Sequence, residues 1–330
     1  MTAPRFAGFR RILLTGGSGF VGGYLCPLLA DETPDARRVL LNRPGDDRSR
    51  TGWEPAFAEI FDEAAIAAII EEVKPDLVLH LAAQSSVGAG HASAGETWRT
   101  NFGGSFALAL ACSRFTPEAT VLFASSAEVY GLSFRQGKVD EDAPLRPQNP
   151  YARSKAAAEQ MLGDILAPTN QLIVTRAFNH TGPGQDERFV LPSFAAQIAR
   201  IEAGRQPPCL QVGNLDAERD FLDVRDVCRG YLALIEAARS LPARAVFNIS
   251  SGRARSIHDL LQTMKAYSKA QFDVVVDPER LRGSDIPRAV GSSSRLQAAV
   301  AWRPAIDLRE TLEALVDAAR LRSEERDLLK

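Results

Sequence analysis

The sequence predicts an α/β fold built on a doubly wound parallel sheet. Short apolar segments rich in Val and Leu, without polar alternation, have the composition of parallel strands covered on both faces. Segments of helical character separate them, and regular strand–helix alternation places helices on both faces of one sheet. This is a Rossmann-type arrangement. The expected strands occupy residues 10–15, 37–42, 76–83, 119–126 and 171–178, and the expected helices residues 20–31, 62–73, 94–113 and 151–166.

A smaller α/β domain is expected to interleave with the first. The alternation changes after Arg176, and no long linker, repeat or low-complexity segment follows. The later elements are a loop at 178–189, helices at 190–204, 223–240, 256–268 and from about Leu308, and strands at 209–214, 245–250 and 272–277. Gly204 stands at the end of its helix, as a C-terminal cap does. The strand at 245–250 returns to the main sheet. The predicted domains are 1–176 plus 217–250, and 177–216 plus 251–330.

Charge and composition exclude several kinds of protein. The formal net charge is −2, so no overall field attracts nucleic acid or an anionic membrane. The apolar helical stretches fall far short of the roughly 20 residues that span a bilayer, and no secretory signal is visible. The 4 cysteines lack C-x-x-C spacing, which indicates reduced thiols rather than disulfides or a metal site. We expect a cytoplasmic protein without a bound metal.

A glycine-rich turn joins the first strand to the first helix. The segment GGSGFVG places Gly16, Gly19 and Gly22 at regular spacing between an apolar strand and a helix. Glycines there permit a tight turn and a close approach of the backbone to a pyrophosphate, and the helix N-terminus offers free N–H groups. The sequence therefore predicts a dinucleotide-binding turn.

The end of the second strand indicates which dinucleotide binds. An acidic residue at this place would accept a hydrogen bond from the ribose 2′-hydroxyl of NAD. Here the strand ends in Asn42 and Arg43, and an arginine suits the 2′-phosphate of NADP. The sequence favours NADP, while NAD stays an alternative. The next strand is expected to contain AEIFD, so that Glu59, Ile60 and Asp62 cover the adenine.

Tyr151 and Lys155 are the candidate catalytic pair. They are four residues apart and share one face of a predicted helix. A nearby ammonium is expected to favour the phenolate and lower the phenol pKa, so that the tyrosine exchanges a proton with a sugar oxygen. Ser126 follows a predicted strand, at the carboxyl edge where such sheets bind ligands.

These segments together resemble the extended short-chain dehydrogenase/reductase family, in its nucleotide-sugar-modifying branch. The resemblance covers nearly the whole chain and rests on TGGSGFVG, HLAAQSSV, TNFGG, SSAEVYG, YARSK, RAFNHTGPGQ, RDFLDVRDV and FNISSG. Within the branch, FNHTGPGQDERFV, VGNLDAERDFLDVRDV and RLRGSDIPRAVGSSSRLQAAVAWRP are most similar to reductases of GDP-4-keto-6-deoxy-D-mannose.

The resemblance implies an oxidoreductase in which Ser126, Tyr151 and Lys155 act together. Tyr151 would protonate the C4 oxygen while NADPH delivers hydride to C4, and the product would be GDP-D-rhamnose. The implied cofactor-binding residues are Gly16, Gly19, Phe20, Val21, Gly22, Asn42, Arg43, Glu59, Ile60, Leu81, Ala82, Ala83, Gln84, Tyr151 and Lys155. The residues implied to bind a GDP-sugar are Ser85, Ser86, Ser126, Asn179, Val190, Arg219, Arg282 and Asp285.

Several of these residues have ordinary structural alternatives. Arg219 could pair with Asp220 or Asp223, and Arg282 with Asp285. Asn179 could cap a turn. Of the histidines near the motifs, His180 is interpreted as a structural hydrogen bonder and His80 as a buried core residue.

The fold cannot decide between reductase, dehydratase and epimerase. A 4,6-dehydratase needs an acid/base carboxylate beside the sugar. Glu128 supplies one, whereas Ala127 occupies a position where many dehydratases carry a second acid. Glu128 therefore keeps the dehydratase alternative open. A non-catalytic NADP-binding sensor is a remote alternative.

The resemblance also implies a homodimer. The helices at 94–113 and 151–166 carry apolar residues on more than one face. Members of the family commonly pair these two helices into a four-helix bundle.

Overall fold

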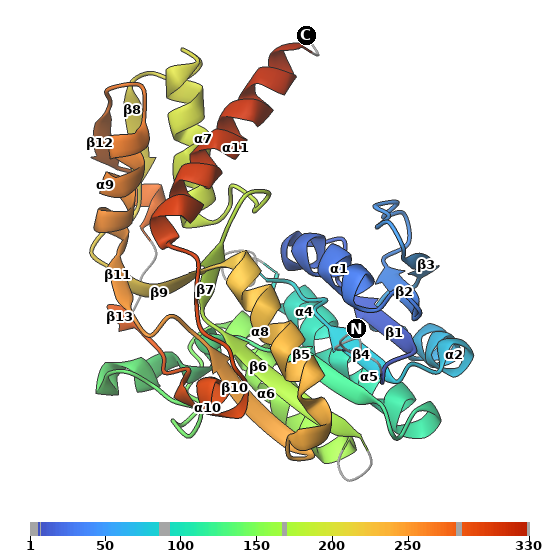
Figure 1. Ribbon diagram of the computed structural model, residues 1–330. Coiled ribbons are helices and arrows are strands. Elements are labelled where there is room, and N and C mark those ends of the chain that lie inside the picture. Colours follow the sequence, from blue (N-terminus) through green and yellow to red (C-terminus); the bar gives the residue numbers. More distant parts are fainter. Residues whose placement is uncertain (1–5, 7, 86–92, 167–169, 282–285, 329–330) are drawn as a thin grey trace.

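The computed structural model describes residues 6, 8–85, 93–166, 170–281 and 286–328 (Figure 1). Within this part of the chain, parallel strands form a seven-stranded sheet in the order β10-β6-β5-β4-β1-β2-β3. Its strands are β1 (Arg11–Thr15), β2 (Arg37–Asn42), β3 (Glu54–Phe57), β4 (Leu77–His80), β5 (Thr120–Ala124), β6 (Gln171–Ala177) and β10 (Arg244–Ile249). The Rossmann-type prediction is confirmed.

Helices cover both faces of this sheet. On one face, α1 (Phe20–Glu32) and α8 (Val224–Glu236) enclose a core that contains Leu14 and Leu25. On the other face, α2 (Glu63–Val73), α5 (Gly104–Phe115) and α6 (Pro150–Leu166) enclose a second core with Leu13 and Val121. Neighbouring residues of β1 thus point into opposite cores, which explains why its apolar residues do not alternate with polar ones.

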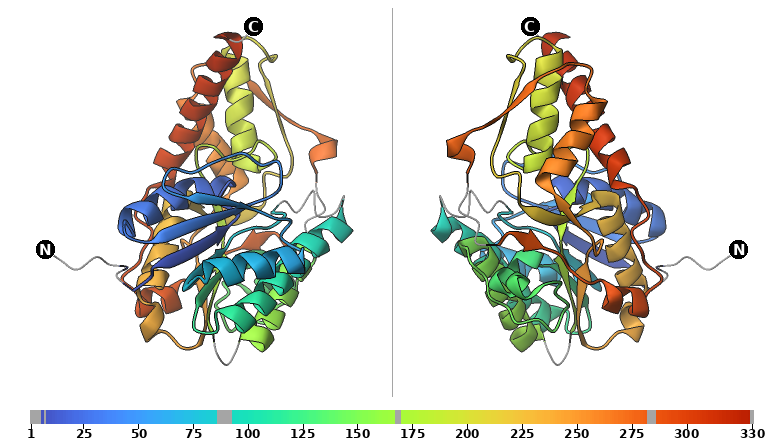
Figure 2. Two further views of the ribbon diagram at one scale, coloured as in Figure 1. Left: turned by 90° about the vertical axis from the view of Figure 1, so that its right-hand side faces the viewer. Right: turned by 90° about the vertical axis from the view of Figure 1, so that its left-hand side faces the viewer.

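The smaller part of the molecule stands above the carboxyl edge of the large sheet (Figure 2). Its helices α7 (Val190–Glu202), α9 (Ile257–Tyr267) and α11 (Leu308–Leu328) pack around a separate core that includes Phe194 and Leu315. Two small sheets accompany them. Their strands are β7 (Asn179–Thr181), β9 (Glu218–Asp223), β11 (Ala254–Ser256) and β13 (Arg288–Ala289) in one sheet, and β8 (Cys209–Val212) and β12 (Asp273–Val276) in the other.

Short elements complete the fold. The π-helix η1 (Arg99–Gly103) joins α4 (Ala94–Trp98) to α5. The 3₁₀ helices are η2 (Ala127–Gln136), η3 (Ala238–Ser240) and η4 (Pro278–Arg280), and α10 (Ser294–Ala299) lies against β10. Gly204 has a positive φ of 68° just beyond α7, as its predicted role at the helix end requires.

Several features differ from the sequence prediction, among them strand β7, which lies inside the expected loop at 178–189. The third strand ends at Phe57, so the AEIFD segment lies beyond it. The expected helix at 94–113 is divided by the π-helical turn of η1. The segment 218–223 forms a strand of the small sheet, because β9 pairs with β7, β11 and β13 rather than with β10. The division into two domains stays a proposal.

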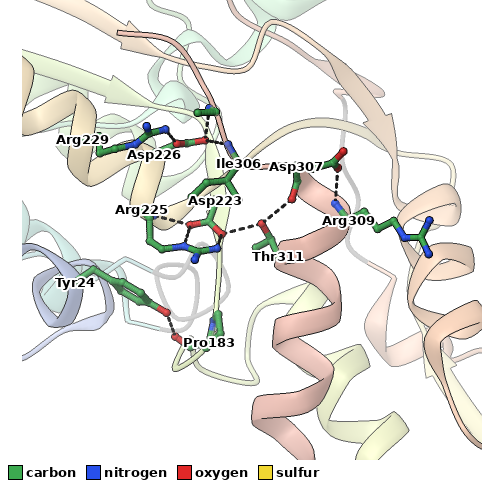
Figure 3. A network of polar contacts seen from close by, with 11 residues as sticks. Tyr24, Pro183, Asp223, Arg225, Asp226, Arg229, Ile306, Asp307, Arg309 and Thr311 are labelled. Atoms are coloured by element: carbon green, nitrogen blue, oxygen red, sulfur yellow. Dashed lines mark hydrogen bonds and ion pairs between the residues drawn. The ribbon is translucent and has the colours of Figure 1, made fainter.

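Two buried carboxylates at the start of α8 join the two parts (Figure 3). Asp223 caps α8, binds Arg225 and accepts a hydrogen bond of 2.8 Å from Thr311 of α11. Asp226 accepts from the backbone N–H groups of Ala305 and Ile306, each at 3.1 Å. The C-terminal helix is thereby fixed to the strand and helix that border the large sheet.

Candidate active site

A cleft with a volume of about 2030 Å³ lies between the carboxyl edge of the large sheet and the smaller part. Every described site residue that the sequence predicts lines this cleft, with the exception of Asp62. They are Gly16, Gly19, Phe20, Val21, Gly22, Asn42, Arg43, Glu59, Ile60, Leu81, Ala82, Ala83, Gln84, Ser85, Ser126, Glu128, Tyr151, Lys155, Asn179, Val190 and Arg219. Ser86, Arg282 and Asp285 lie outside the described residues.

The glycine-rich turn has the geometry of a backbone cradle. Gly16 has a φ of +76°, and a Cβ there would lie 2.6 Å from the backbone nitrogen of Ala82. A Cβ on Gly22 would lie 2.3 Å from the Cα of Gly17. Gly19 precedes the first residue of α1 and has no side chain to cap it. The turn therefore presents the N-terminus of α1 to the cleft, where N–H groups and the helix dipole favour an anion.

Asn42 organises the loop that follows β2. Its Nδ2 donates to the carbonyl oxygens of Asp46 at 3.3 Å and Arg48 at 3.1 Å. Its Oδ1 is buried without a hydrogen-bond partner among the described residues. This leaves an acceptor where the ribose of a dinucleotide is expected.

Arg48 is a cleft residue that the sequence prediction missed. Its guanidinium binds both oxygens of Asp46, at 2.8 and 2.7 Å, and reaches Ser18 of the glycine-rich turn at 3.5 Å. The Arg48 hydrogen bonds hold the pKa of Asp46 well below its usual range. Only the chain reversal after Arg43 brings Arg48 to this place, and no local pattern identifies it.

The AEIFD segment fulfils its predicted role in part. Glu59 and Ile60 line the cleft, but they belong to the connection between β3 and α2. Asp62 instead caps α2, where its Oδ1 accepts from the Ala65 N–H at 3.1 Å. The assignment of Asp62 to the adenine site was wrong, because an aspartate before an amphipathic segment is a preferred helix cap.

Buried polar side chains hold the cofactor side of the cleft together. His80 binds Thr15 at 2.8 Å and Ser105 at 3.0 Å, and burial lowers its pKa to about 3. It is a neutral core histidine, as the sequence predicts. In η1, the amide of Asn101 accepts from the N–H of Gln84 at 2.8 Å and donates to Ser154 of α6 at 3.0 Å. The π-helical turn points this amide inward, a role that the prediction missed.

Tyr151 and Ser126 meet at the cleft wall. Asn149 caps the first turn of α6 by accepting from the Ala152 N–H at 2.8 Å, which starts the helix just before Tyr151. Ser126 has extended backbone at the end of β5 and caps η2. Burial raises the pKa of Tyr151 to about 12, and a hydrogen bond with Ser126 acts in the opposite direction. The phenol is therefore neutral at ordinary pH.

Lys155 lies one helical turn from Tyr151 and is 2% exposed. Its Nζ donates to the carbonyl oxygen of Ala124 at 2.7 Å. Burial lowers the pKa of Lys155 to about 7, against an opposing effect of Glu159. The expectation that the ammonium lowers the pKa of Tyr151 is wrong for this state, because desolvation of the phenol dominates.

Glu128 and Arg219 face each other across the substrate side. Burial raises the pKa of Glu128, while Arg219 and a 3.4 Å hydrogen bond from Asn149 act against it. The Arg219 guanidinium donates to the carbonyl oxygens of Glu218 and Pro287. The carboxylates proposed as alternative partners are engaged elsewhere, because Asp220 accepts from Ser251 and Asp223 binds Arg225.

The remaining predicted residues come from β7 and α7. Asn179 is exposed at the start of β7, which pairs with β9, and therefore does not only cap a turn. His180 binds the carbonyl oxygen of Phe178 at 2.9 Å and stacks on Phe20, which agrees with a structural role. Val190 is the first residue of α7 and is 39% exposed.

The described residues contain neither a metal site nor a membrane span. No group of three or more His, Cys, Asp or Glu side chains is placed to hold a metal ion there. No described helix combines the length and apolar character that a membrane span requires. The 4 cysteines Cys26, Cys112, Cys209 and Cys228 are free thiols.

Known proteins share this architecture over nearly its whole length. Residues 13–315 match the family model described as GDP-mannose 4,6 dehydratase. GDP-6-deoxy-D-mannose reductase of Pseudomonas aeruginosa is 34% identical over 313 residues, covering 93% of this chain and 96% of that protein. UDP-glucose 4-epimerase of Neisseria meningitidis serogroup B is 26% identical, over 92% of this chain and 95% of that one.

A solved structure gives the same result. RMD from Pseudomonas aeruginosa, complexed with NADPH, superposes with a TM-score of 0.78 at 32% identity and covers 94% of this chain and 99% of its own. The cleft, the glycine-rich turn and the Ser–Tyr–Lys arrangement thus occur in a chain whose relatives act on nucleotide sugars. The chain belongs to the GDP-mannose 4,6-dehydratase family of extended short-chain dehydrogenases/reductases.

Proposed function

We propose that this enzyme reduces the C4 ketone of GDP-4-keto-6-deoxy-D-mannose to GDP-D-rhamnose with NADPH. The meeting of Tyr151 and Ser126 at the cleft wall beside Lys155 carries this proposal, because it offers a proton donor to a bound ketone, and the 34% identity to a GDP-6-deoxy-D-mannose reductase supports it. Reduction of a ketone needs a proton donor. The first step of a dehydratase or epimerase, oxidation of a C4 hydroxyl, needs a base at the same place.

The described residues fit an NADP cofactor. A Cβ at Gly16 or Gly22 would collide with the backbone of Ala82 or Gly17, so the tight turn that presents the N-terminus of α1 to a pyrophosphate requires glycine at both positions. The orphaned Oδ1 of Asn42 is an acceptor for a ribose hydroxyl. Arg43 and Arg48, both lining the cleft, supply cations for a 2′-phosphate. NAD stays an alternative, because Asp46 lies among these cations. When bound, NADPH supplies the hydride.

The chain's own residues position the sugar and move the proton. The Tyr151 hydroxyl gives its proton to the C4 oxygen, and the Ser126 hydroxyl donates a hydrogen bond to the same oxygen. Lys155 holds the nicotinamide ribose and supplies positive charge beside the phenol as it ionises. Ser85, Asn179, Val190 and Arg219 contact the nucleotide sugar, and Arg219 offsets the charge of its diphosphate. Ser86, Arg282 and Asp285 are further proposed substrate residues.

NADPH oxidation tests the proposal directly. Purified protein is mixed with NADPH and either GDP-4-keto-6-deoxymannose or GDP-mannose, and absorbance is followed. We expect stoichiometric NADPH loss with the keto sugar alone. No loss with the keto sugar, together with a 4-keto product from GDP-mannose and no net cofactor consumption, would contradict it.

One observation favours a 4,6-dehydratase as a second candidate. Glu128 lines the cleft, and burial raises its pKa, as an acid/base group for elimination requires. Arg219, which faces Glu128, is equally suited to bind a diphosphate. A 4-keto product from GDP-mannose, formed without net cofactor consumption in the same assay, would identify the dehydratase activity.

We further propose a homodimer that acts in the cytoplasm. The support for the dimer is an exposed aromatic face on α4, η1 and α5, beside α6. The support for the location is the set of free thiols and the reduced cofactor that the reaction consumes.

A further inference from the structure

The carboxyl end of β5 is fastened to α6 at two points, one helical turn apart. Lys155 donates to the carbonyl oxygen of Ala124 at 2.7 Å. Glu159, the next residue on the same face of α6, accepts a hydrogen bond from the hydroxyl of Ser125. Ser126 follows directly in the chain. The two contacts therefore set the position of Ser126 relative to Tyr151, which lies one turn earlier on α6.

Glu159 is paired with an arginine in the interior. It is 1% exposed, and Arg176 of β6 binds both its oxygens, through Nε at 3.1 Å and Nη2 at 2.7 Å. A buried carboxylate is costly unless it is paired and hydrogen-bonded, and here both conditions are met. Arg176 in turn donates to Tyr130 at 3.0 Å and to the carbonyl oxygen of Glu141 at 3.1 Å.

We propose that Glu159 is a positioning residue for the reduction. It fixes the Ser125–Ser126 end of β5 against α6 and supplies the negative charge that holds Lys155 protonated. The inference rests on the proposed function. The reacting atoms touch Ser126 and Tyr151, so Glu159 acts through Ser125 and Lys155.

The charge part of the proposal follows from the surroundings of Lys155. Burial alone favours the neutral amine, and Glu159 opposes it. His80 on β4 is neutral, and Tyr151 keeps its proton. Arg176 on β6 is a cation already bound to Glu159.

Two more distant groups complete these surroundings. Glu128 follows β5 at the cleft and has a raised pKa. The phenol of Tyr231 on α8 also lines the cleft and is held neutral, because burial raises its pKa. Among the described groups around Lys155, Glu159 is therefore the carboxylate that opposes the loss of its proton.

Three variants separate the negative charge of Glu159 from its hydrogen bond with Ser125, which we call the tether. Glu159→Gln removes the charge but keeps an acceptor for Ser125. Ser125→Ala removes the tether but keeps the charge. Glu159→Asp keeps the charge on a shorter side chain. The measurement is kcat and KM for the keto sugar from about pH 6 to about pH 9.

The expected results differ between the variants. In Glu159→Gln, Lys155 loses its proton at a lower pH than in the wild type. The alkaline limb of the kcat profile, where kcat falls as pH rises, therefore shifts to lower pH. At a given pH on that limb, kcat falls by about tenfold per pH unit of the shift. Ser125→Ala and Glu159→Asp lower kcat with the limb in its wild-type position. The proposal would be overturned if the alkaline limb of kcat in Glu159→Gln stayed at the wild-type pH, or if kcat in Ser125→Ala were unchanged.

A matched control guards against a purely structural effect. Glu202→Gln removes another carboxylate bound to an arginine, Arg320, outside the cleft. It should change stability but not the pH profile. If Glu159→Gln does not fold, kcat of Ser125→Ala and Glu159→Asp still tests whether the Ser125–Glu159 hydrogen bond positions Ser126. An unchanged kcat in both variants would reject that role.

The proposed function can fail separately. Wild-type turnover of the keto sugar tests it alone. If the wild type is inactive, the same proteins are titrated with NADPH by fluorescence over the same pH range. Glu159→Gln should then lose NADPH affinity at a lower pH than wild type, and identical pH dependence would overturn the inference.

Discussion

The proton on Tyr151 is the property on which the proposed chemistry depends. The side chain is 9% exposed, and burial raises its pKa to about 12. An ionised phenolate would lack water around it, so the neutral form is favoured. The residue therefore begins a turnover as an acid.

Replacing Tyr151 by Phe tests this role. We expect kcat to fall by about 10³-fold, because a positioned general acid contributes on the order of 10² to 10⁴. NADPH affinity should stay within about twofold, because the ring and the helix are retained. Assays of turnover and fluorescence titration measure the two quantities. A Tyr151→Phe variant that keeps its turnover would show that Tyr151 is not the proton donor.

Arg48 and Asp46 form a charge pair beside the glycine-rich turn. The Asp46 carboxylate binds the Arg48 guanidinium, which is also the group that a 2′-phosphate would bind. Both side chains line the cleft. A phosphate bound there must compete with Asp46 for Arg48. We therefore expect the pair to influence how strongly NADPH is preferred over NADH.

Opposite changes are expected from the two residues. Arg48→Ala should weaken NADPH binding on the order of tenfold with little effect on NADH, and Asp46→Asn should strengthen NADPH binding. Fluorescence titration of both cofactors gives the ratio. Arg37→Ala is the control, because Arg37 is bound to Glu54 outside the cleft. Equal effects on both cofactors would refute this role for Arg48.

Among the elements, α7, α9 and α11 are joined by one carboxylate. Glu202 at the end of α7 binds Arg320 of α11 at 2.7 Å and accepts from Ser268 and the Lys269 N–H beyond α9. Burial alone would raise its pKa, but these hydrogen bonds hold it at about 2. The ionised form therefore stabilises the folded state.

Acid should remove this contribution. The folded-state pKa is depressed, so the stabilisation is present above the unfolded value near pH 4.5 and is lost as pH falls toward 2. Glu202→Gln should lower the free energy of unfolding at pH 7 by roughly 1 to 3 kcal/mol. Urea denaturation at neutral and acidic pH measures it. If Glu202→Gln lowered the free energy of unfolding by the same amount near pH 2 as at pH 7, the charge of Glu202 would not be the cause.

At the scale of the whole molecule, one apolar stripe of the described residues is only partly covered, because Phe102 packs against the core while Trp98 and Leu110 are exposed. Trp98, Phe102, Phe106 and Leu110 follow one another at four-residue spacing along α4, η1 and α5. The ring centroids are 6.1 and 6.5 Å apart, and Trp98 and Leu110 are 38% and 39% exposed. Apolar stripes with exposed residues mark protein interfaces, which supports the proposed dimer.

Sedimentation velocity tests the dimer. We expect the native chain to sediment as a dimer and the double variant Trp98→Glu, Leu110→Glu as a monomer, because the charges would be buried in the interface. Phe57→Glu is the control, since Phe57 is 49% exposed at the end of β3, outside the stripe. A native monomer at all concentrations would refute the interface.

Much of the site could be predicted because its signals are local. Gly16, Gly19 and Gly22 are close in the chain, and Tyr151 and Lys155 are separated by one helical turn. Strand and helix order follows from apolar periodicity, which needs only neighbouring residues. These features predicted the Rossmann-type sheet, which is confirmed, and they identified the glycine-rich turn and the pair Tyr151 and Lys155, all of which line the cleft.

The tertiary structure alone decided what depends on burial and on chain segments that meet. It brought Arg48 to Ser18 and Asn101 to Ser154, pairs that no local spacing connects. It also reversed the expected pKa shift of Tyr151. Desolvation depends on every surface that surrounds the phenol, and those surfaces come from β5, α6 and the cleft walls. The sequence determined which groups are present, and packing determined their protonation.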